Sequence, residues 1–432
     1  MKWLTGAQYW SSKISSQAIE DQLENSIDQS VLDIIRQVKE AGDRAVNSLT
    51  NQFDGIKLDD FTVTKDEFAE ARDRVSPAFV PALEQAKTNI TRFHQRQLQQ
   101  SWIDSSIPGI VLGQQVTPLE RVGIYIPGGK AAYPSTVLMN VIPAKIAGVE
   151  SIVITTPPQP NGKVNPHILV AAEKAGADTV YKIGGAQAIA ALAYGTETIN
   201  KVQKITGPGN AYVARAKKWV FGEVAIDMIA GPSEICIVAD DTAPADFVAA
   251  DLLSQAEHDE AATPICIVWN NKQATAIQEE MERQTALLER EEIITKSVQQ
   301  NGKFILVEDL YEAMDIANDI APEHLQLMIE NPIEKLGYIK NAGAIFLGNY
   351  SPEALGDYMA GPNHTLPTNG TAAFSSPLGV YDFMKKSSVI QYDKQSLLNT
   401  VDAITELATT EKLTAHAQAI QIRKEDDSNA KA

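Results

Sequence analysis

Histidine is scarce in this chain, and most of its histidines lie beside carboxylates. The sequence contains six histidines. Four of them fall in short polar segments rich in Asp and Glu: His258, His324, His364 and His416. Imidazole is the commonest metal ligand, and its pKa suits proton transfer near neutral pH. Histidine used in this way predicts a metal site and an acid/base site, as in an enzyme.

The segment around His258 offers two possible metal ligands at helical spacing. Gln255 and His258 are three residues apart, so a helix would direct both side chains from one face. Such a pair can hold a metal ion. The alternative is a polar helix end whose neighbouring carboxylates are simply solvated. No His-Glu-x-x-His motif is present, which argues against a zincin-type peptidase.

Glu323 and His324 directly follow Pro322. Proline is common at a first helical position, so we predict that a helix begins here. Adjacent side chains on a helix diverge by about 100°, and the two could therefore line different sides of a pocket. One would handle a substrate hydroxyl and the other a water. The alternative is a capping carboxylate beside a surface imidazole.

A loop punctuated by glycine and proline is expected over residues 356–368. Long polar loops without a repeating pattern tend to be functional. Asp357 in this loop could complete a metal shell, because carboxylate oxygens suit Zn²⁺ or Mn²⁺. Alternatively, Asp357 is a turn residue that stabilises its own backbone.

Strands and helices that would position these residues alternate from residue 121 onward. Short β-rich runs are expected as strands over 122–126, 151–155, 179–183, 202–206, 224–228, 235–239, 264–269, 304–307 and 344–347. Helical patterns separate most of them, which is typical of parallel sheets wrapped by helices. We therefore predict an α/β protein with two Rossmann-like parallel-sheet domains, each incomplete, and small N- and C-terminal helical extensions.

The same pattern divides the chain into five predicted parts. These are an N-terminal arm (1–24), a first α/β domain with the metal and acid/base residues (25–120 plus 235–378), a second α/β domain (121–234), a small C-terminal domain (379–422) and a disordered charged tail (423–432). Glycine-rich turns at 127–129, 184–187 and 207–210 follow strands of the second α/β domain. Backbone amides there can hold phosphate. None matches the dinucleotide fingerprint, so plain tight turns are the alternative.

Composition limits the classes of partner. The net charge of −18 argues against nucleic acid, and no apolar run approaches the roughly 20 residues of a membrane span. The N-terminus lacks an apolar signal segment, so a cytoplasmic protein is expected. Both cysteines, Cys236 and Cys266, lie in apolar strand-like runs. We expect buried thiols that take no part in catalysis.

Six motifs occur together and in order, and they resemble those of the histidinol dehydrogenase family. They are RVGIYIPGG (121–129), GGAQAIA (184–190), GPGN (207–210), AGPSE (230–234), SQAEH (254–258) and APEHL (321–325). The resemblance runs from about residue 30 to residue 422. It implies a zinc enzyme that oxidises L-histidinol to L-histidine through bound L-histidinal, reducing two NAD⁺.

The resemblance also implies individual roles. The implied metal ligands are Gln255, His258, Asp357 and His416, and the implied acid/base pair is Glu323 and His324. Substrate contacts map onto Ser233, His364 and Glu411, together with His324 and the four metal ligands, and NAD contacts onto Tyr125, Gln187 and Asn210. One zinc per subunit is implied, in a homodimer whose C-terminal unit completes the partner's site. Glu411 and His416 would then act across the interface.

The chemistry of these side chains agrees with that reading. A neutral His324 can accept the alcohol proton as hydride leaves, and Glu323 is a suitable base for the water that histidinal must add. A shell of nitrogen and oxygen ligands leaves positions open for the imidazole and amine of histidinol. The alternatives are a zinc hydrolase that needs no NAD, a non-catalytic metal-binding protein, and an NAD-dependent relative that oxidises a related amino alcohol.

Overall fold

Two parallel sheets lie in the larger of the two units into which the chain divides. The computed structural model describes residues 1–12, 21–128 and 132–429. One unit comprises Met1–Leu98 and Leu119–Phe383, and the other comprises Gln99–Pro118 and Met384–Ala432. The predicted class, α/β with two parallel sheets, is confirmed. Among the described helices, none has the length and apolar character of a membrane span.

The five-stranded sheet is built from the glycine-rich middle of the sequence. Its strands, in spatial order, are β6 (Thr179–Lys182), β5 (Ser151–Thr156), β4 (Arg121–Tyr125), β7 (Lys204–Thr206) and β8 (Ala225–Ile226). All neighbouring strands are parallel, and their apolar runs are buried as expected of a sheet covered on both faces. The helices that connect them are α5 (Pro134–Ala147), α6 (Pro166–Ala175), α7 (Gly185–Tyr194) and α8 (Ala211–Val220).

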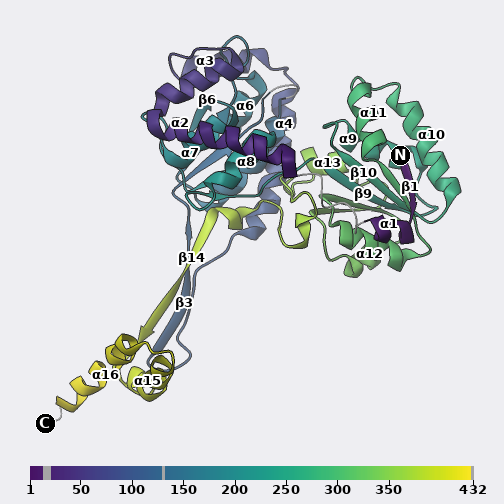
Figure 1. The fold of residues 1–432 in the computed structure, drawn as a ribbon. Helices are drawn as coiled ribbons and strands as arrows, with labels where there is room; N and C mark the ends of the chain where they lie inside the picture. The colour runs from purple at the N-terminus through teal and green to yellow at the C-terminus, as the bar shows by residue number, and fades with distance from the viewer. Residues whose placement is uncertain (13–20, 129–131, 430–432) are drawn as a thin grey trace. The chain divides into compact units, whose positions relative to one another are not determined.

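Three further helices pack against the connecting helices of this sheet (Figure 1): α2 (Asp21–Asp54), α3 (Lys65–Arg74) and α4 (Phe79–His94). α2 packs against α7 and α8, and its apolar face shares one core with them. α3 and α4 pack with α5 and α6. This packing differs from the predicted grouping, which joined residues 25–120 to residues 235–378. The apolar face of an amphipathic helix shows that the helix packs against another element. The sequence pattern does not identify which sheet that element belongs to.

The six-stranded sheet carries the acid/base candidates. In spatial order its strands are β1 (Lys2–Thr5), β11 (Lys303–Leu306), β10 (Thr263–Val268), β9 (Glu234–Ala239), β12 (His324–Met328) and β13 (Ala344–Leu347), all parallel. On one face lie α9 (Ala245–Ala256), α10 (Asn271–Thr285) and α11 (Glu291–Gln300), and on the other lies α12 (Leu310–Ile320). Cys266 is buried on the first face and Cys236 on the second, each fully enclosed.

The N-terminal segment is part of this sheet. Residues 1–24 were expected to form an arm, but β1 pairs in parallel with β11, and α1 (Gly6–Ser12) follows. The side chains of β1 are mostly exposed. The segment therefore lacks the alternation of buried apolar and exposed polar residues from which a strand is predicted. Residues 13–20 of the expected arm lie outside the described residues.

The expected helix start at Pro322 is wrong. α12 ends at Ile320, and Ala321 caps it in the left-handed conformation with φ of 47°. Pro322 therefore follows a helix end, another place where proline is common. The next residues form β12, which begins at His324 and is buried throughout. Similarly, the loop expected over 356–368 begins inside a helix, because α13 (Glu353–Tyr358) carries Asp357.

The smaller unit combines an antiparallel sheet with short helices. Its strand order is β14 (Met384–Tyr392), β3 (Ile110–Pro118) and β2 (Trp102–Asp104), and its helices are α14 (Lys394–Leu398), α15 (Val401–Thr410) and α16 (Thr414–Asn429). α16 continues into the segment expected to be a disordered tail from residue 423, and residues 430–432 lie outside the described part. The larger unit also contains short 3₁₀ turns: η2 (Gln95–Gln97), η3 (Pro332–Tyr338), η4 (Thr371–Ala373) and η5 (Val380–Phe383).

Candidate active site and metal centre

His324 stands at the amino end of the six-stranded sheet, where β9 and β12 both begin. Its Nδ1 lies 3.0 Å from the backbone carbonyl oxygen of Glu234. A carbonyl only accepts, so Nδ1 carries the proton and Nε2 presents its lone pair. Nε2 is buried and has no hydrogen-bond partner among the described residues. Burial lowers the pKa of His324 to about 4, which keeps the ring neutral at pH 7.

Glu323 is buried beside His324 without bonding to it. Its Oε2 accepts a hydrogen bond of 2.9 Å from the backbone N–H of Glu234 and lies 3.8 Å from His324 Nδ1. Burial raises the pKa of Glu323 well above its ordinary value, and the nearby carboxylates of Glu234 and Asp357 add to the rise. A buried carboxyl with a raised pKa is a candidate for proton transfer.

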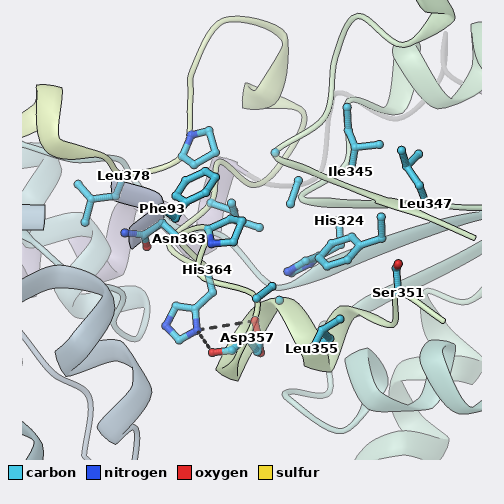
Figure 2. A pocket seen from close by; sticks show the side chains of 18 of the residues that line it. Phe93, His324, Ile345, Leu347, Ser351, Leu355, Asp357, Asn363, His364 and Leu378 are labelled. Atoms are coloured by element: carbon cyan, nitrogen blue, oxygen red, sulfur yellow. Dashed lines mark hydrogen bonds and ion pairs between the residues drawn. The ribbon is translucent and has the colours of Figure 1, made fainter. Parts of the chain in front are cut away.

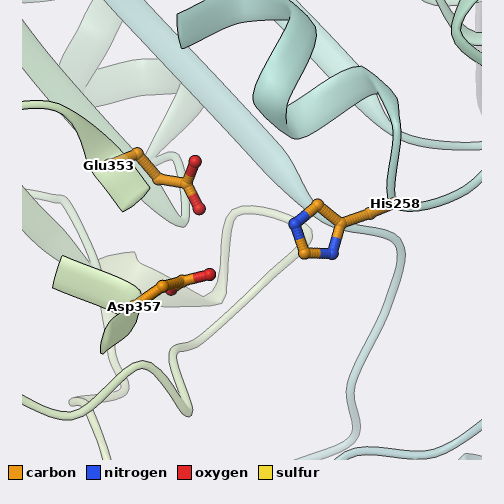
Figure 3. Close-up of side chains that lie close together, drawn as sticks. All are labelled: His258, Glu353 and Asp357. Carbon is orange, nitrogen blue, oxygen red and sulfur yellow. The ribbon is translucent and has the colours of Figure 1, made fainter. Parts of the chain in front are cut away.

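Three side chains form a cluster that can hold a metal ion (Figure 3). Each of His258, Glu353 and Asp357 offers one ligand atom, and these atoms lie within 4.8 Å of one another. His258 follows the end of α9, whereas Glu353 and Asp357 are four residues apart on α13 and share one face of it. Glu353 was not among the predicted site residues. The spacing of four residues between Glu353 and Asp357 indicates a shared helix face only if residues 353–358 are known to be helical.

The donor set fits zinc. The side-chain oxygen Oε1 of Gln255 is buried without a hydrogen-bond partner among the described residues, three residues before His258. Burial and mutual repulsion raise the pKa of Glu353 to about 8, and burial raises that of Asp357 to about 6. A cation between them would relieve both effects. Nitrogen and oxygen donors without a thiolate are a set that Zn²⁺ or Mn²⁺ accepts.

His364 connects this cluster to the helices of the five-stranded sheet. Its Nδ1 lies 3.1 Å from the carbonyl oxygen and 3.7 Å from the Oδ1 of Asp357 (Figure 2), and its Nε2 lies 3.1 Å from the Oγ1 of Thr136 on α5. Burial lowers its pKa to about 4. The adjacent Asn363 donates to the backbone of α5 at Met139. Elements from both sheets therefore hold His364 in place.

His324, Asp357 and His364 face a common cavity of about 490 Å³. The rest of its lining is mostly apolar (Figure 2) and includes Phe93, Ile345, Leu366, Leu378 and Tyr381. A concave space of this size with a few converging polar groups is the usual form of a small-molecule site.

The residues assigned to NAD lie around the carboxyl edge of the five-stranded sheet. Tyr125 ends β4, and its hydroxyl oxygen accepts a hydrogen bond of 3.1 Å from the N–H of Gly185. Gln187 lies buried in the first turn of α7, with no partner for Oε1 among the described residues. Asn210 caps α8 through a bond of 3.1 Å from the N–H of Val213. Nucleotides bind along this edge of parallel sheets.

Gly207 fixes the turn that leads into Asn210. Its φ is 105°, a conformation that other residues rarely adopt, and a Cβ there would collide with the carbonyl oxygen of Tyr125. Beneath the turn, Lys217 donates to the Gly207 carbonyl and pairs with the buried Asp227, which accepts from the Gly207 N–H. The turn is therefore held rigidly against the end of β4.

Sequence and structure comparisons identify the family. A family model for histidinol dehydrogenase matches residues 17–424. The chain belongs to the histidinol dehydrogenase family. It is 59% identical to the histidinol dehydrogenase of Oceanobacillus iheyensis over 93% of this chain and 94% of the relative. It is 53% identical to that of Listeria monocytogenes over 99% and 100%. The crystal structure of histidinol dehydrogenase from Elizabethkingia anophelis superposes with a TM-score of 0.92 at 38% identity, covering 99% of this chain and 98% of the other.

Family membership makes the chain an oxidoreductase, and the structure offers it no accessible thiol. Burial raises the pKa of Cys236 to about 12 and that of Cys266 well above its ordinary value. Both thiols therefore stay protonated and enclosed at neutral pH. This burial agrees with the expectation that neither takes part in catalysis.

Three further residues were expected to contact the substrate or the metal. Ser233 immediately precedes β9, half-buried, and its carbonyl accepts from the N–H of Thr263. Glu411 follows α15 and His416 lies in α16, so both belong to the smaller unit, where both are exposed. The roles of these two residues in the histidinol dehydrogenase reaction stay predictions.

Proposed function

We propose that the chain is a zinc-dependent histidinol dehydrogenase that oxidises L-histidinol to L-histidine through L-histidinal and reduces two NAD⁺. The observation that carries this proposal is the lone pair of His324 Nε2, which is unpartnered and directed into a site with metal-ligand side chains. As an enzyme of amino-acid biosynthesis it would work in the cytoplasm, where NAD⁺ is supplied.

In the first oxidation, His324 acts as the base. Nε2 accepts the hydroxyl proton of histidinol while hydride passes to the nicotinamide ring of NAD⁺. The bond from Nδ1 to the Glu234 carbonyl fixes the tautomer that this step requires. The same bond stabilises the imidazolium that forms, because the carbonyl dipole faces the protonated ring.

In the second oxidation, Glu323 acts on water. Histidinal must add water before a second hydride can leave, and the ionised carboxyl of Glu323 is a strong base because its pKa is raised by burial. The N–H of Glu234 holds one oxygen of this carboxyl, so the other remains for the water. Ser233 and His364 would contact the substrate on either side of the reacting carbon.

We assign zinc to Gln255, His258 and Asp357, with His416 as the fourth ligand. When bound, the cation supplies a grip on the imidazole and amine of histidinol and so fixes the reacting carbon. NAD⁺ would contact Tyr125, Gln187 and Asn210. The apolar cavity lining beside His324 excludes water around the transferring hydride.

We further propose that two copies share their active sites. Glu411 and His416 are exposed in the smaller unit, which also exposes large apolar side chains that a partner would cover: Trp102, Ile103, Ile390 and Leu407. In the proposed homodimer, Glu411 would bind substrate and His416 would bind zinc in the site of the other copy.

An assay of purified protein with zinc, NAD⁺ and L-histidinol tests the reaction. We expect two NADH for each histidinol consumed and L-histidine as the product. A family member that had drifted to a related amino alcohol would produce NADH with that alcohol and none with histidinol. One NADH per histidinol, with histidinal released, would contradict the two-step oxidation.

A further inference from the structure

Glu353 is a buried carboxylate in the candidate site to which neither the sequence motifs nor the proposed mechanism gives a role. It is 2% exposed and opens α13. Its Oε2 accepts a hydrogen bond of 2.9 Å from the hydroxyl of Ser254 on α9. Its Oε1 lies 4.0 Å from the Nε2 of His324. Glu353 therefore belongs to the metal cluster and also lies close to His324, the proposed base.

Ser254 and Asp357 both hydrogen-bond to the carboxyl of Glu353, but neither of them is a cation. Among the described residues, no lysine or arginine forms an ion pair with Glu353, and the Nε2 of His324, 4.0 Å from it, is a lone-pair acceptor. A buried charge is costly unless it is paired and hydrogen-bonded. Its oxygen Oε1 is therefore suited to a donor, preferably a cationic one, that arrives with the ligand.

The substrate class supplies such a donor at the required place. This step rests on the proposed function. Histidinol is a 1,2-amino alcohol, so its nitrogen and oxygen sit on adjacent carbons. When His324 Nε2 faces the hydroxyl, the amine must fall within a few bond lengths of the same atom, and Glu353 Oε1 occupies that neighbourhood. An amine that also binds a metal through its lone pair keeps its N–H groups for an acceptor.

We propose that Glu353 binds the substrate's amine and makes the site selective for 1,2-amino alcohols over alcohols that lack the amine. Ser254 acts as a positioning residue, because its hydroxyl holds Oε2 and turns Oε1 toward His324. Asp357 shows no comparable contact with His324, and its side chain faces His364 instead. The two carboxylates of α13 would thus divide their roles, with Asp357 on the metal and Glu353 on the amine.

The test uses a pair of ligands that differ only in the amine. Histamine has the imidazole and the amine of histidinol, whereas 4-ethylimidazole has the same imidazole and carbon chain without the amine. Binding of both to zinc-loaded protein is measured by calorimetry for the wild type and for Glu353→Gln. Loss of a hydrogen bond to a charged group should weaken the binding of histamine to Glu353→Gln by about 10- to 100-fold. Binding of 4-ethylimidazole and the zinc content should not change.

Asp251→Asn is the matched control. Asp251 is another buried carboxylate of the same unit, and it accepts a hydrogen bond of 2.8 Å from Gln326. Its neutralisation should leave the ratio of histamine to 4-ethylimidazole affinity unchanged. Glu353→Asp, which keeps the charge, should recover part of the preference for histamine.

Two outcomes would overturn the inference. Equal weakening of both ligands would mean that Glu353 only supports the fold, and loss of zinc from Glu353→Gln would make it a metal ligand. Failure of the proposed function would be distinct, because the wild type would then produce no NADH from histidinol. A wild type that oxidises histidinol, with an unchanged ligand ratio in Glu353→Gln, would reject the inference alone.

Discussion

The Nδ1 atom of His324 lies 3.0 Å from the backbone carbonyl oxygen of Glu234, across two neighbouring parallel strands. The orienting group is a main-chain atom at the start of β9, so it is fixed by the sheet register that pairs His324 with Ile235. A base held in this way needs no side-chain partner to define its tautomer. The sheet itself therefore determines which nitrogen of His324 carries the proton.

Replacing His324 by asparagine should remove the base and keep the hydrogen bond to the backbone carbonyl of Glu234. The asparagine amide can still donate to the Glu234 carbonyl, but it cannot take up a proton. We expect kcat for histidinol oxidation to fall by about 10²- to 10⁴-fold, with the affinity for histamine nearly unchanged. Steady-state kinetics and calorimetry measure the two. A loss confined to KM would contradict the role of His324 as a base.

Glu323→Gln should separate the two oxidations. The first oxidation needs no water, whereas the second depends on the hydration that Glu323 assists. We expect the oxidation of L-histidinal to slow by about 10²-fold or more, and by a larger factor than the formation of histidinal from histidinol. Single-turnover measurement of NADH from each substrate tests this. Equal slowing of both steps would argue that Glu323 acts in another way.

Removal of the metal should abolish turnover reversibly. A chelator should strip about one zinc per subunit, and activity should return with Zn²⁺ or Mn²⁺. His258→Ala should bind metal at least 10-fold more weakly, because one of few protein ligands is lost. His167→Ala is the control, since His167 packs edge-on against Phe79 and is far from the cluster residues in the sequence. Undiminished metal content in His258→Ala would exclude the proposed site.

Sequence patterns identified the buried strands well and the surroundings of the site poorly. The central strands, such as β4 and β9, read as continuous apolar runs because parallel strands are covered on both faces. β12 has the same buried character, but Pro322 suggested a helix start and masked it. The meaning of a proline depends on whether a helix precedes or follows it, and a single sequence does not mark the end of α12.

In the candidate site, too, some residues could be predicted from the sequence and others could not. Motifs pointed to His258, Asp357 and His324, because each is a chemically distinctive residue in a polar segment. Glu353 gave no such signal, since its proposed role depends on a six-residue helix and on the side chain of Ser254, 99 residues away. The carbonyl of Glu234 could not be found either, because every residue carries one and only the strand register selects it.

Buried neutral histidine should make the fold sensitive to acid. His94 is fully buried, its Nδ1 is 2.7 Å from Gln97 Oε1, and burial lowers its pKa below the ordinary 6.5. The unfolded chain therefore binds a proton at this residue below about pH 6.5 while the folded chain does not. Its contribution to stability is present above that pH and is lost as the pH falls.

His94→Asn can still donate to Gln97 but does not titrate. We expect the free energy of unfolding of this variant to fall less steeply than that of the wild type between about pH 6.5 and pH 5. Denaturant unfolding at several pH values measures the two slopes. Parallel slopes would show that His94 is protonated equally in both states.

Mixing two variants that are each impaired in forming L-histidine should restore that activity if active sites are shared. Glu323→Gln damages the larger unit, and His416→Ala damages the smaller one. In a heterodimer with shared sites, one site collects both lesions and the other collects neither, so up to about a quarter of wild-type activity should return after random exchange, since half the dimers are mixed and each has one intact site. The control mixture of Glu323→Gln with His258→Ala should stay inactive, because both lesions lie in the larger unit and each site of the heterodimer receives one. Demonstrated exchange without recovery in the first mixture would mean that each site is built from a single chain, and His416 would then have to reach the zinc of its own copy.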